Sequence, residues 1–397
     1  MSSKAHIDHA RRLEERGGTA AAASRCRGVS LIRRFVHAAV ADVERDLDRL
    51  ADLIAEGEGH EKRVRVLAYA GYRTDEKLHI KGRIVRFAPG LNKAVSTWDR
   101  LAAMMAIYNS DELPNVTVRM DSYGQTTETV TNEEGYFTFD VPVARPLPEA
   151  TAWEHVSLST PDREAQQASI TVPVLAPGAN LNWGIISDID DTVVETGATN
   201  FLKNWRRVLI DQPGDRLAVP GAATLYQTIA VDHRAPARPF FYVSSSPWNL
   251  YGFLTEYMEL NAIPHGPMFL KDYGIDDNQL IDAGHDTHKL AAIETIMAAY
   301  PALRFLLIGD NGQRDVAIYA KVVQDFGQRV AGVFIRDVDG SCRSGPEGAL
   351  LADIEARGVP TYCGSGFDDA VALVQQLELD RPLEAASAVL QSAADGE

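Results

Sequence analysis

The sequence predicts an α/β protein: a parallel-sheet domain preceded by a small β-sandwich-like domain and an N-terminal helix. Three observations predict this arrangement. Between residues 178 and 380, short apolar runs alternate with helical patterns, which is the order that gives a parallel sheet. Between residues 61 and 177, short strand-like runs broken by Gly and Pro are typical of a small sandwich. From Gly28 to Ala55, apolar residues recur at three- and four-residue steps, as in an amphipathic helix.

The chain has 397 residues, more than a single core of usual size accommodates, so several domains are expected. We divide it into 1–60, a helical and partly disordered segment; 61–177, the sandwich-like domain; 178–380, the α/β domain; and 381–397, a tail. With 45% hydrophobic and 24% charged residues, the composition is that of a soluble globular protein. No stretch approaches the ~20 consecutive apolar residues of a transmembrane helix, and the polar N-terminus is not expected to be a secretory signal.

The net charge of -16 argues against nucleic acid as a general partner. The charge is uneven, because the first hundred residues carry 20 Lys and Arg against 14 Asp and Glu, whereas the rest carry 19 against 41. The amphipathic helix at Gly28–Ala55, with Arg33, Arg34, Arg45 and Arg49 between its apolar residues, fits peripheral contact with an anionic membrane. Packing of its apolar stripe against the protein itself is the alternative interpretation.

The three cysteines are few, odd in number and widely spaced: Cys26, Cys342 and Cys363. This pattern indicates neither a disulfide framework nor a zinc site, and it predicts a reducing, cytoplasmic location.

Within the sandwich-like domain, residues 62–90 and 114–143 are expected to form β-structure, with a helix over Ser96–Tyr108 between them. The stretch 130–139 has the form of a hairpin whose acidic turn ends in Gly135, a residue that can supply a positive φ. None of these segments carries recognisable chemistry.

Residues 144–180 are rich in proline and are expected to hold the last strand of this domain and a linker. In the α/β domain, strands are expected over 184–187, 238–243, 267–270, 304–308 and 330–335, and helices over 201–210, 220–230, 248–260 and 290–299.

An acidic cluster follows the first of these strands. Gly184–Ser187 is a short run without alternation, typical of a buried parallel strand, and its carboxyl end carries Asp188, Asp190 and Asp191. Crowded carboxylates repel one another unless a cation lies among them, and hard oxygens suit Mg²⁺. The cluster therefore indicates metal-assisted phosphate chemistry with a carboxylate nucleophile. An ordinary acidic turn is an equally good interpretation of this stretch by itself.

Polar groups also follow the later strands. Ser244 and Ser245 stand at the end of the next strand, where a hydroxyl can bind a phosphate oxygen. Lys289 lies near the start of a helix that Asp286 or Thr287 can cap, in a position where a cation is unfavourable unless it holds an anion.

A further acidic pair follows the strand over 304–308. Gly309 and Gly312 permit a tight turn there, Asp310 stands at the strand end, and Asp315 lies in the first turn of the next helix. Both carboxylates can therefore point at one site.

These elements occur in one order: DxDxT at 188–192, Ser244, Lys289 and GDxxxxD at 309–315. The combination resembles the haloacid dehalogenase (HAD) superfamily of phosphohydrolases. More narrowly, residues 187–192, 242–248 and 271–274 resemble the actin-patch-type phosphatidate phosphatase family, and 132–137 resemble the region before its catalytic domain. The resemblance implies a HAD-like Rossmannoid sheet, and the intervals from Thr192 to Ser244 and from Ser244 to Lys289 hold no obvious inserted cap domain.

The resemblance implies catalytic roles for three residues. Asp188 would attack phosphorus and form an aspartyl-phosphate. Asp190 would protonate the leaving alcohol and then deprotonate the hydrolytic water. Thr192 would help to position Asp190.

The resemblance also implies how phosphate and metal are held. Ser244, Ser245 and Lys289 would bind the phosphoryl oxygens. Lys271 follows a short strand and is a rival for the lysine role, but the helix of Lys289 leads directly into the strand that carries Asp310. The implied ligands of Mg²⁺ are Asp188, Asp190 through its backbone carbonyl, Asp310 and Asp315.

The implied reaction is hydrolysis of phosphatidate to diacylglycerol and phosphate at a membrane surface. Two alternatives remain: a HAD phosphatase for phosphoproteins or another bulky phosphomonoester, and a non-catalytic membrane or protein adaptor. Four clustered carboxylates argue against the adaptor, because a scaffold has no need of them.

Overall fold

A computed structural model describes residues 63–87, 113–161, 169–190, 192–193, 219–230, 237–271, 285–377 and 379. The expected helices at Gly28–Ala55, Ser96–Tyr108 and 201–210, the tail and Asp191 lie outside these residues. The chain divides into two compact units, Met1–Gly59 and His60–Glu397, and every described residue belongs to the second.

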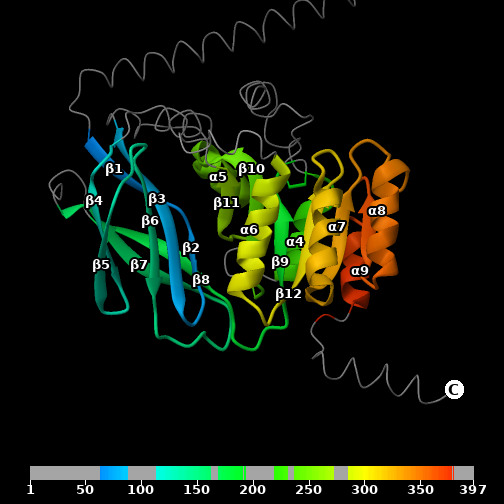
Figure 1. Ribbon diagram of the computed structural model, residues 1–397, viewed down its shortest axis with the longest axis horizontal. Coiled ribbons are helices and arrows are strands. Elements are labelled where there is room, and N and C mark those ends of the chain that lie inside the picture. The colour runs from blue at the N-terminus through cyan, green and yellow to red at the C-terminus, as the bar shows by residue number, and fades with distance from the viewer. Residues whose placement is uncertain are drawn as a thin grey trace, which may run out of the picture. The chain divides into compact units, whose positions relative to one another are not determined.

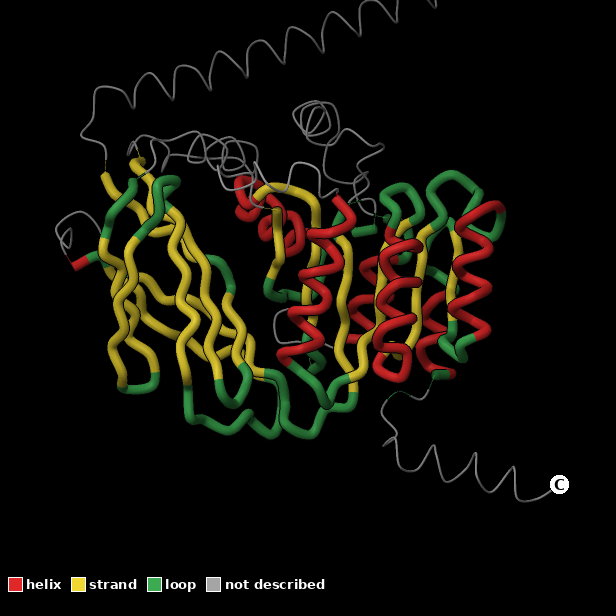
Figure 2. The backbone as a smooth tube through the Cα atoms, viewed as in Figure 1, coloured by secondary structure: helices red, strands yellow, loops and turns green. Residues whose placement is uncertain are grey.

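The first half of the described chain forms one curled, eight-stranded sheet (Figures 1 and 2). Its strands are β1 (Arg63–Ala68), β2 (Gly71–Arg73), β3 (Lys77–Phe87), β4 (Thr117–Ser122), β5 (Gln125–Val130), β6 (Tyr136–Pro142), β7 (Ala152–Ser159) and β8 (Ile170–Ala176). The order is β1-β3-β2-β8-β7-β4-β5, with β6 also paired to β3. All pairs are antiparallel except β2 with β8. Alternate residues point inward, so side chains such as Val118, Met120, Phe137 and Phe139 share one buried core.

The hairpin predicted over 130–139 is wrong, because β5 pairs with β4 and β6 pairs with β3. The turn itself is as expected: Gly135 has φ 77°, and Asn132 Oδ1 accepts hydrogen bonds from two backbone N–H groups. The hairpin of this region is β4–β5, whose turn residues Tyr123 and Gly124 have φ of 50° and 81°. Residues 144–180 also hold two strands, β7 and β8, rather than one.

The second half is an α/β domain, as predicted, with a six-stranded parallel sheet. The strands are β9 (Trp183–Asp188), β10 (Phe240–Pro247), β11 (Met268–Lys271), β12 (Arg304–Asp310), β13 (Val330–Arg336) and β14 (Thr361–Gly364). The helices are α4 (Ala222–Ala230), α5 (Tyr251–Leu260), α6 (His285–Ala299), α7 (Asp315–Phe326), α8 (Gly345–Ala356) and α9 (Ala370–Gln376), with short 3₁₀ turns η4 (Trp248–Leu250) and η6 (Gly327–Arg329). None of the described helices is long and apolar enough to span a bilayer.

Helices cover both faces of this sheet, which explains why its strands are continuous apolar runs. Ile185 of β9 packs in a core with residues of α4, α5 and α9. Its neighbour Ile186 packs in a second core with residues of α6, α7 and α8, the three helices at the front of Figure 1. Every residue of β9 is buried.

The strand order β11-β10-β9-β12-β13-β14 contains a topological switch point. From β9 the chain builds outward through β10 and β11, and then returns to the other side of β9 as β12. Connections on the two sides diverge at the carboxyl ends of these strands, where open α/β sheets bind ligands. Asp188, Ser244 and Asp310 lie at or near the carboxyl ends of the three central strands.

The cysteine prediction is wrong in one respect, because Cys342 and Cys363 form a disulfide with a Cα–Cα distance of 6.6 Å. Cys363 lies in β14 and Cys342 follows β13, and pairing of these strands brings the two thiols together. Spacing along the chain could not show this adjacency.

Candidate active site

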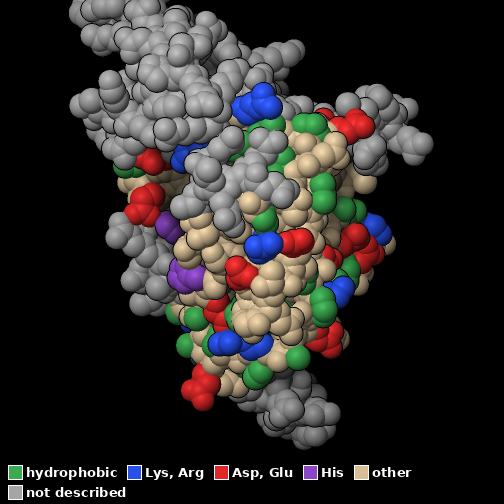
Figure 3. Space-filling model, turned by 90° about the vertical axis from the view of Figure 1, so that its left-hand side faces the viewer, with side chains coloured by type: hydrophobic (Ala, Val, Ile, Leu, Met, Phe, Trp, Pro, Cys, Tyr) green, Lys and Arg blue, Asp and Glu red, His purple; other side chains and the backbone are tan. Residues whose placement is uncertain are grey.

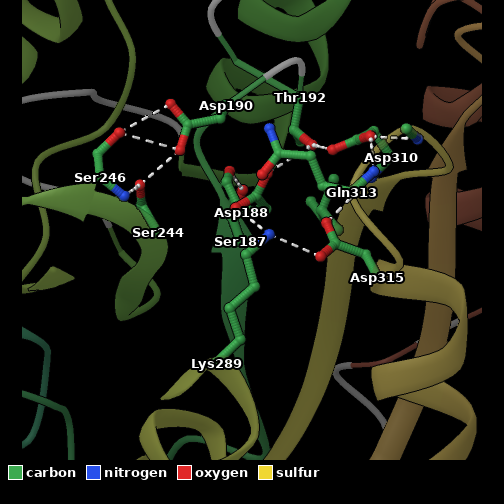
Figure 4. A network of polar contacts seen from close by, with 12 residues as sticks. Ser187, Asp188, Asp190, Thr192, Ser244, Ser246, Lys289, Asp310, Gln313 and Asp315 are labelled. Atoms are coloured by element: carbon green, nitrogen blue, oxygen red, sulfur yellow. Dashed lines mark hydrogen bonds and ion pairs between the residues drawn. The ribbon is translucent and has the colours of Figure 1, made fainter. Parts of the chain in front are cut away.

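Asp188, the last residue of β9, lies at the centre of a buried network of charges (Figure 4). Its side chain is 1% exposed, and its Oδ1 lies 2.8 Å from Lys289 Nζ. The same ammonium group lies 2.7 Å from Asp315 Oδ1. Lys289 therefore bridges two carboxylates that arrive from different strand ends.

Lys289 reaches this position from α6, although not in the way predicted. The helix begins at His285, so Asp286 and Thr287 lie within its first turn and Lys289 lies beyond it. Burial acts to lower the pKa of Lys289, but the charges of Asp188 and Asp315 outweigh burial and raise the pKa above its ordinary value. Lys289 is therefore a fixed cation at neutral pH. The rival residue, Lys271, ends β11 and is half-buried.

The turn after β12 places two more carboxylates. Asp310 Oδ1 accepts hydrogen bonds from the backbone N–H groups of Gly312 (2.5 Å) and Gln313 (3.0 Å). Asp315, the first residue of α7, accepts one at Oδ2 from the N–H of Asp310, at 3.3 Å. The positive φ of this turn belongs to Arg314, at 67°, rather than to a glycine.

Gly309 is needed because other side chains approach its backbone closely, and not because of its backbone angles. A Cβ at this position would lie 2.6 Å from Asp315 Oδ2 and 2.8 Å from Tyr319 Oη. The absence of a side chain therefore leaves room for the Asp315 carboxylate.

One oxygen each of Asp188, Asp310 and Asp315 lies within 4.8 Å of the others, an arrangement that could hold a metal ion. Burial raises the pKa of Asp188 well above its ordinary value; Lys289 opposes this effect, and the neighbouring carboxylates add to it. One lysine does not balance three buried carboxylates, so a cation would favour their ionised state. Three hard oxygen donors fit Mg²⁺.

Asp190 lies beside this group but directs its carboxyl elsewhere. Ser244 Oγ donates to Asp190 Oδ2 at 2.6 Å, and Ser246 Oγ lies 3.1 and 3.2 Å from the two carboxyl oxygens (Figure 4). The Thr192 hydroxyl lies 3.4 Å from Asp188 Oδ2 and 3.5 Å from Asp310 Oδ2. Its described contacts are therefore with two of the three carboxylates that could hold a metal ion.

Ser246 is a site residue that the sequence analysis missed. The strand β10 continues through the serines, so Ser244 and Ser246 share one face and are buried, while Ser245 faces the other way and is half-buried. Once the strand is known to continue through the serines, its period-2 pattern identifies Ser246 and sets aside Ser245.

Asn311 is a second residue without an assigned role in the sequence analysis. Its Nδ2 donates to Asp337 Oδ1 (3.0 Å) and Asp339 Oδ1 (2.8 Å), and its Oδ1 accepts from the N–H of Val338 (2.7 Å). It holds the loop after β13 against the turn that follows Asp310.

Residues 183–337 match the sequence model of a protein family described as "Phosphatidate phosphatase APP1, catalytic domain". This segment resembles an APP1-type catalytic domain. The resemblance of residues 187–192, 242–248 and 271–274 to this family is thereby confirmed, and all the site residues described above except Val338 and Asp339 lie inside the matched segment.

Two fungal relatives match the chain. "Phosphatidate phosphatase APP1" of Saccharomyces cerevisiae is 30% identical over 185 residues, which cover 46% of this chain and 30% of the yeast protein. An uncharacterized protein of Schizosaccharomyces pombe is 29% identical over 214 residues, covering 52% and 34%. The chain thus spans about a third of the length of these relatives.

Among solved structures, a carbohydrate acetylesterase from Xanthomonas citri is 9% identical, with 74% of this chain and 65% of that chain covered. Its TM-score of 0.25 is too low to support any argument about the present fold.

Proposed function

We propose that the protein is a Mg²⁺-dependent phosphatidate phosphatase whose α/β domain is of the HAD type and lacks a large cap. One observation carries the proposal: Lys289 bridges Asp188 and Asp315 at the switch point of the sheet, beside Asp310, within the APP1-type segment. These residues supply a nucleophile, a fixed cation and metal ligands at the edge of the sheet where the parallel strands end.

In the proposed reaction, an oxygen of Asp188 forms a bond to phosphorus while the phosphorus–oxygen bond to the lipid alcohol breaks. Asp190 gives its proton to the departing alkoxide and later takes one from the water that hydrolyses the aspartyl-phosphate. The 2.6 Å contact between Ser244 and Asp190 supports this assignment, because a phosphoryl oxygen bound to Ser244 would lie within reach of the acid. Lys289 would offset the charge on another phosphoryl oxygen.

The proposed ligands of Mg²⁺ are the carboxylates of Asp188, Asp310 and Asp315 and the backbone carbonyl of Asp190. When bound, the ion would reduce the repulsion between the Asp188 carboxylate and the anionic phosphoryl group. The side chain of Asp190 stays with Ser244 and Ser246, which suits an acid–base group better than a ligand.

The proposed substrate is phosphatidate, presented at a membrane surface. The name of the yeast relative supports this choice. A phosphoprotein or another bulky phosphomonoester is the alternative, because a site without a large cap accepts either. A non-catalytic adaptor would not need the buried charge network.

Membrane contact is assigned to segment 1–60, through the apolar stripe and the arginines of its predicted amphipathic helix, because its 10 Lys and Arg are balanced by 10 Asp and Glu. On the face in Figure 3, Lys and Arg side chains lie among Asp and Glu, and the side chains drawn in colour form no continuous basic patch there. A cytoplasmic location remains a prediction, and the Cys342–Cys363 disulfide removes part of the sequence argument for it.

The decisive test is phosphate release from phosphatidate in mixed micelles and from a soluble phosphomonoester, with and without Mg²⁺. We expect Mg²⁺-dependent release from the lipid that is lost in Asp188→Asn and Asp190→Asn, since these variants remove the nucleophile and the acid. Activity that survives Asp188→Asn would contradict the aspartyl-phosphate mechanism. Release from the soluble ester alone would contradict the lipid assignment and retain the chemistry.

A further inference from the structure

Trp248 connects the catalytic serines to the curled sheet. It is the first residue after β10 and lies two positions beyond Ser246. Its side chain is 7% exposed and stacks on Tyr69, which follows β1, with ring centroids 4.2 Å apart and an interplanar angle of 23°. An aromatic contact of this kind fixes both position and orientation of the ring.

A lysine of the curled sheet also lies over the Trp248 ring. Lys81 of β3 has its Nζ 5.0 Å from the Trp248 ring centroid and 5.3 Å from that of Tyr136, which begins β6. The ammonium group thus interacts with one aromatic ring of its own sheet and one ring of the α/β domain. Such cation–π contacts strengthen when they are shielded from water, and Lys81 is half-buried.

A second link holds the same region. Tyr251, the first residue of α5, accepts a hydrogen bond at Oη from the N–H of Ala70, at 2.8 Å. Its ring centroid lies 4.6 Å from that of Tyr69. The turn from Trp248 to Tyr251 is therefore fixed against the short connection between β1 and β2.

The end of β10 needs support of this kind. Its pairing with β11 is irregular between Val243 and Pro247, so the regular ladder does not fix the serine segment on that side. Pro247, with φ -70°, joins Ser246 to Trp248 with little freedom. A displacement of Trp248 would therefore be transmitted to Ser246 and to its contacts with Asp190.

We propose that Lys81 and Trp248 are positioning residues, through which the curled sheet holds the Ser244–Ser246 segment against Asp190. The effect on catalysis rests on the proposed phosphatase function. The sheet would then act on the phosphoryl-transfer step itself, for a lipid and for a soluble substrate alike.

The test compares Lys81→Met, Lys81→Arg and the control Lys77→Met, which removes an exposed lysine from the same strand. For both substrates we expect kcat to fall about tenfold or more in Lys81→Met with KM unchanged, because small displacements of catalytic groups are costly. Lys81→Arg retains a cation over the rings and should restore most of the rate. Lys77→Met should behave as wild type.

A second readout does not depend on activity. The N–H of Ser246 donates to Ser244 Oγ at 2.9 Å, and Lys81→Met should increase hydrogen exchange across 244–248 while Lys77→Met does not. Unchanged exchange and an unchanged kcat would overturn the proposal. A rise in KM for phosphatidate alone would also overturn it, because Lys81 would then contact the lipid rather than position the serines. Loss of exchange protection in a protein inactive on both substrates would retain the positioning role and reject the phosphatase.

Discussion

At the scale of single residues, Gly309 shows how closely the site is packed. The Asp315 carboxylate occupies the space where a Cβ of residue 309 would stand. This carboxylate contacts Lys289, and it is one of the three that could hold a metal ion. A single methyl group is therefore enough to disturb the charge network.

We predict that Gly309→Ala lowers Mg²⁺ affinity and phosphatase rate by about tenfold to a hundredfold, because Asp315 must shift. Gly327→Ala is the matched control, since a Cβ there meets nothing within 4 Å. Calorimetry measures the Mg²⁺ affinity, and initial rates of phosphate release measure the activity. Equal behaviour of the two variants would contradict the role given to Gly309.

The sequence identified most of this site, since strand-end carboxylates and a helix-borne lysine follow from the order of elements. It favoured Lys289 over Lys271, and the structure places Lys289 against Asp188. It missed Ser246 because the strand was expected to end before the serines. Whether a serine continues a strand depends on its neighbours in the sheet, and the local sequence does not contain that information.

At the scale of elements, Arg73 of β2 joins three segments of the curled sheet. It is fully buried, and its Nε and Nη2 lie 2.7 and 2.8 Å from the two oxygens of Glu154 in β7. Tyr123 Oη also donates to Glu154, at 2.5 Å. Burial acts to raise the pKa of Glu154, but the hydrogen bonds from Arg73 and Tyr123 outweigh it and lower the pKa below its ordinary value.

We predict that Glu154→Gln lowers the free energy of unfolding by about 3 kcal/mol at pH 7, because Arg73 is left as a buried, uncompensated charge. A carboxyl with a lowered folded-state pKa stabilises the fold above its unfolded pKa. The difference between wild type and variant should therefore shrink as the pH falls below the ordinary value of 4.5 and through the folded-state value.

Urea denaturation across this pH range measures the difference. Glu128→Gln is the control, because Glu128 pairs with Arg119 at an exposed site where an ion pair contributes little. A Glu154→Gln effect no larger than that of Glu128→Gln, or one independent of pH, would contradict the prediction.

The elements themselves were predicted unevenly. The parallel strands were found from continuous apolar runs, which burial on both faces produces. The 130–139 hairpin failed because Val130 is 55% exposed whereas Phe137 and Phe139 are buried, so the two runs do not share a face. Alternation gives each strand its inner face but does not say which strand is its partner.

At the scale of the whole molecule, residues of the curled sheet enter the cores of the α/β domain. Tyr69 belongs to one of these cores, and Tyr72 and Leu175 belong to the other. The sequence placed a linker near residue 178 and assigned no contact between the two parts. Such contacts between distant segments, like the Cys342–Cys363 pairing, leave no periodic signal in the chain.

For the segment 1–59, which forms the other compact unit, we predict that deletion abolishes binding to vesicles containing anionic phospholipid. The rate on a soluble phosphomonoester should stay unchanged. Co-sedimentation with vesicles measures binding. Undiminished vesicle binding after the deletion would locate the membrane contact elsewhere.

The order of elements along the chain also determines the order in which they can fold during synthesis. All strands of the curled sheet are complete by Ala176, before any residue of the site has been made. The site joins distant positions, since Thr192 and Asp310 meet across 118 positions, and contacts of this kind form late. Tyr69 and Lys81 can therefore already be in place in the nascent chain when Trp248 is made. Trp248 can then pack against them, and the segment with Asp310 and Asp315 follows.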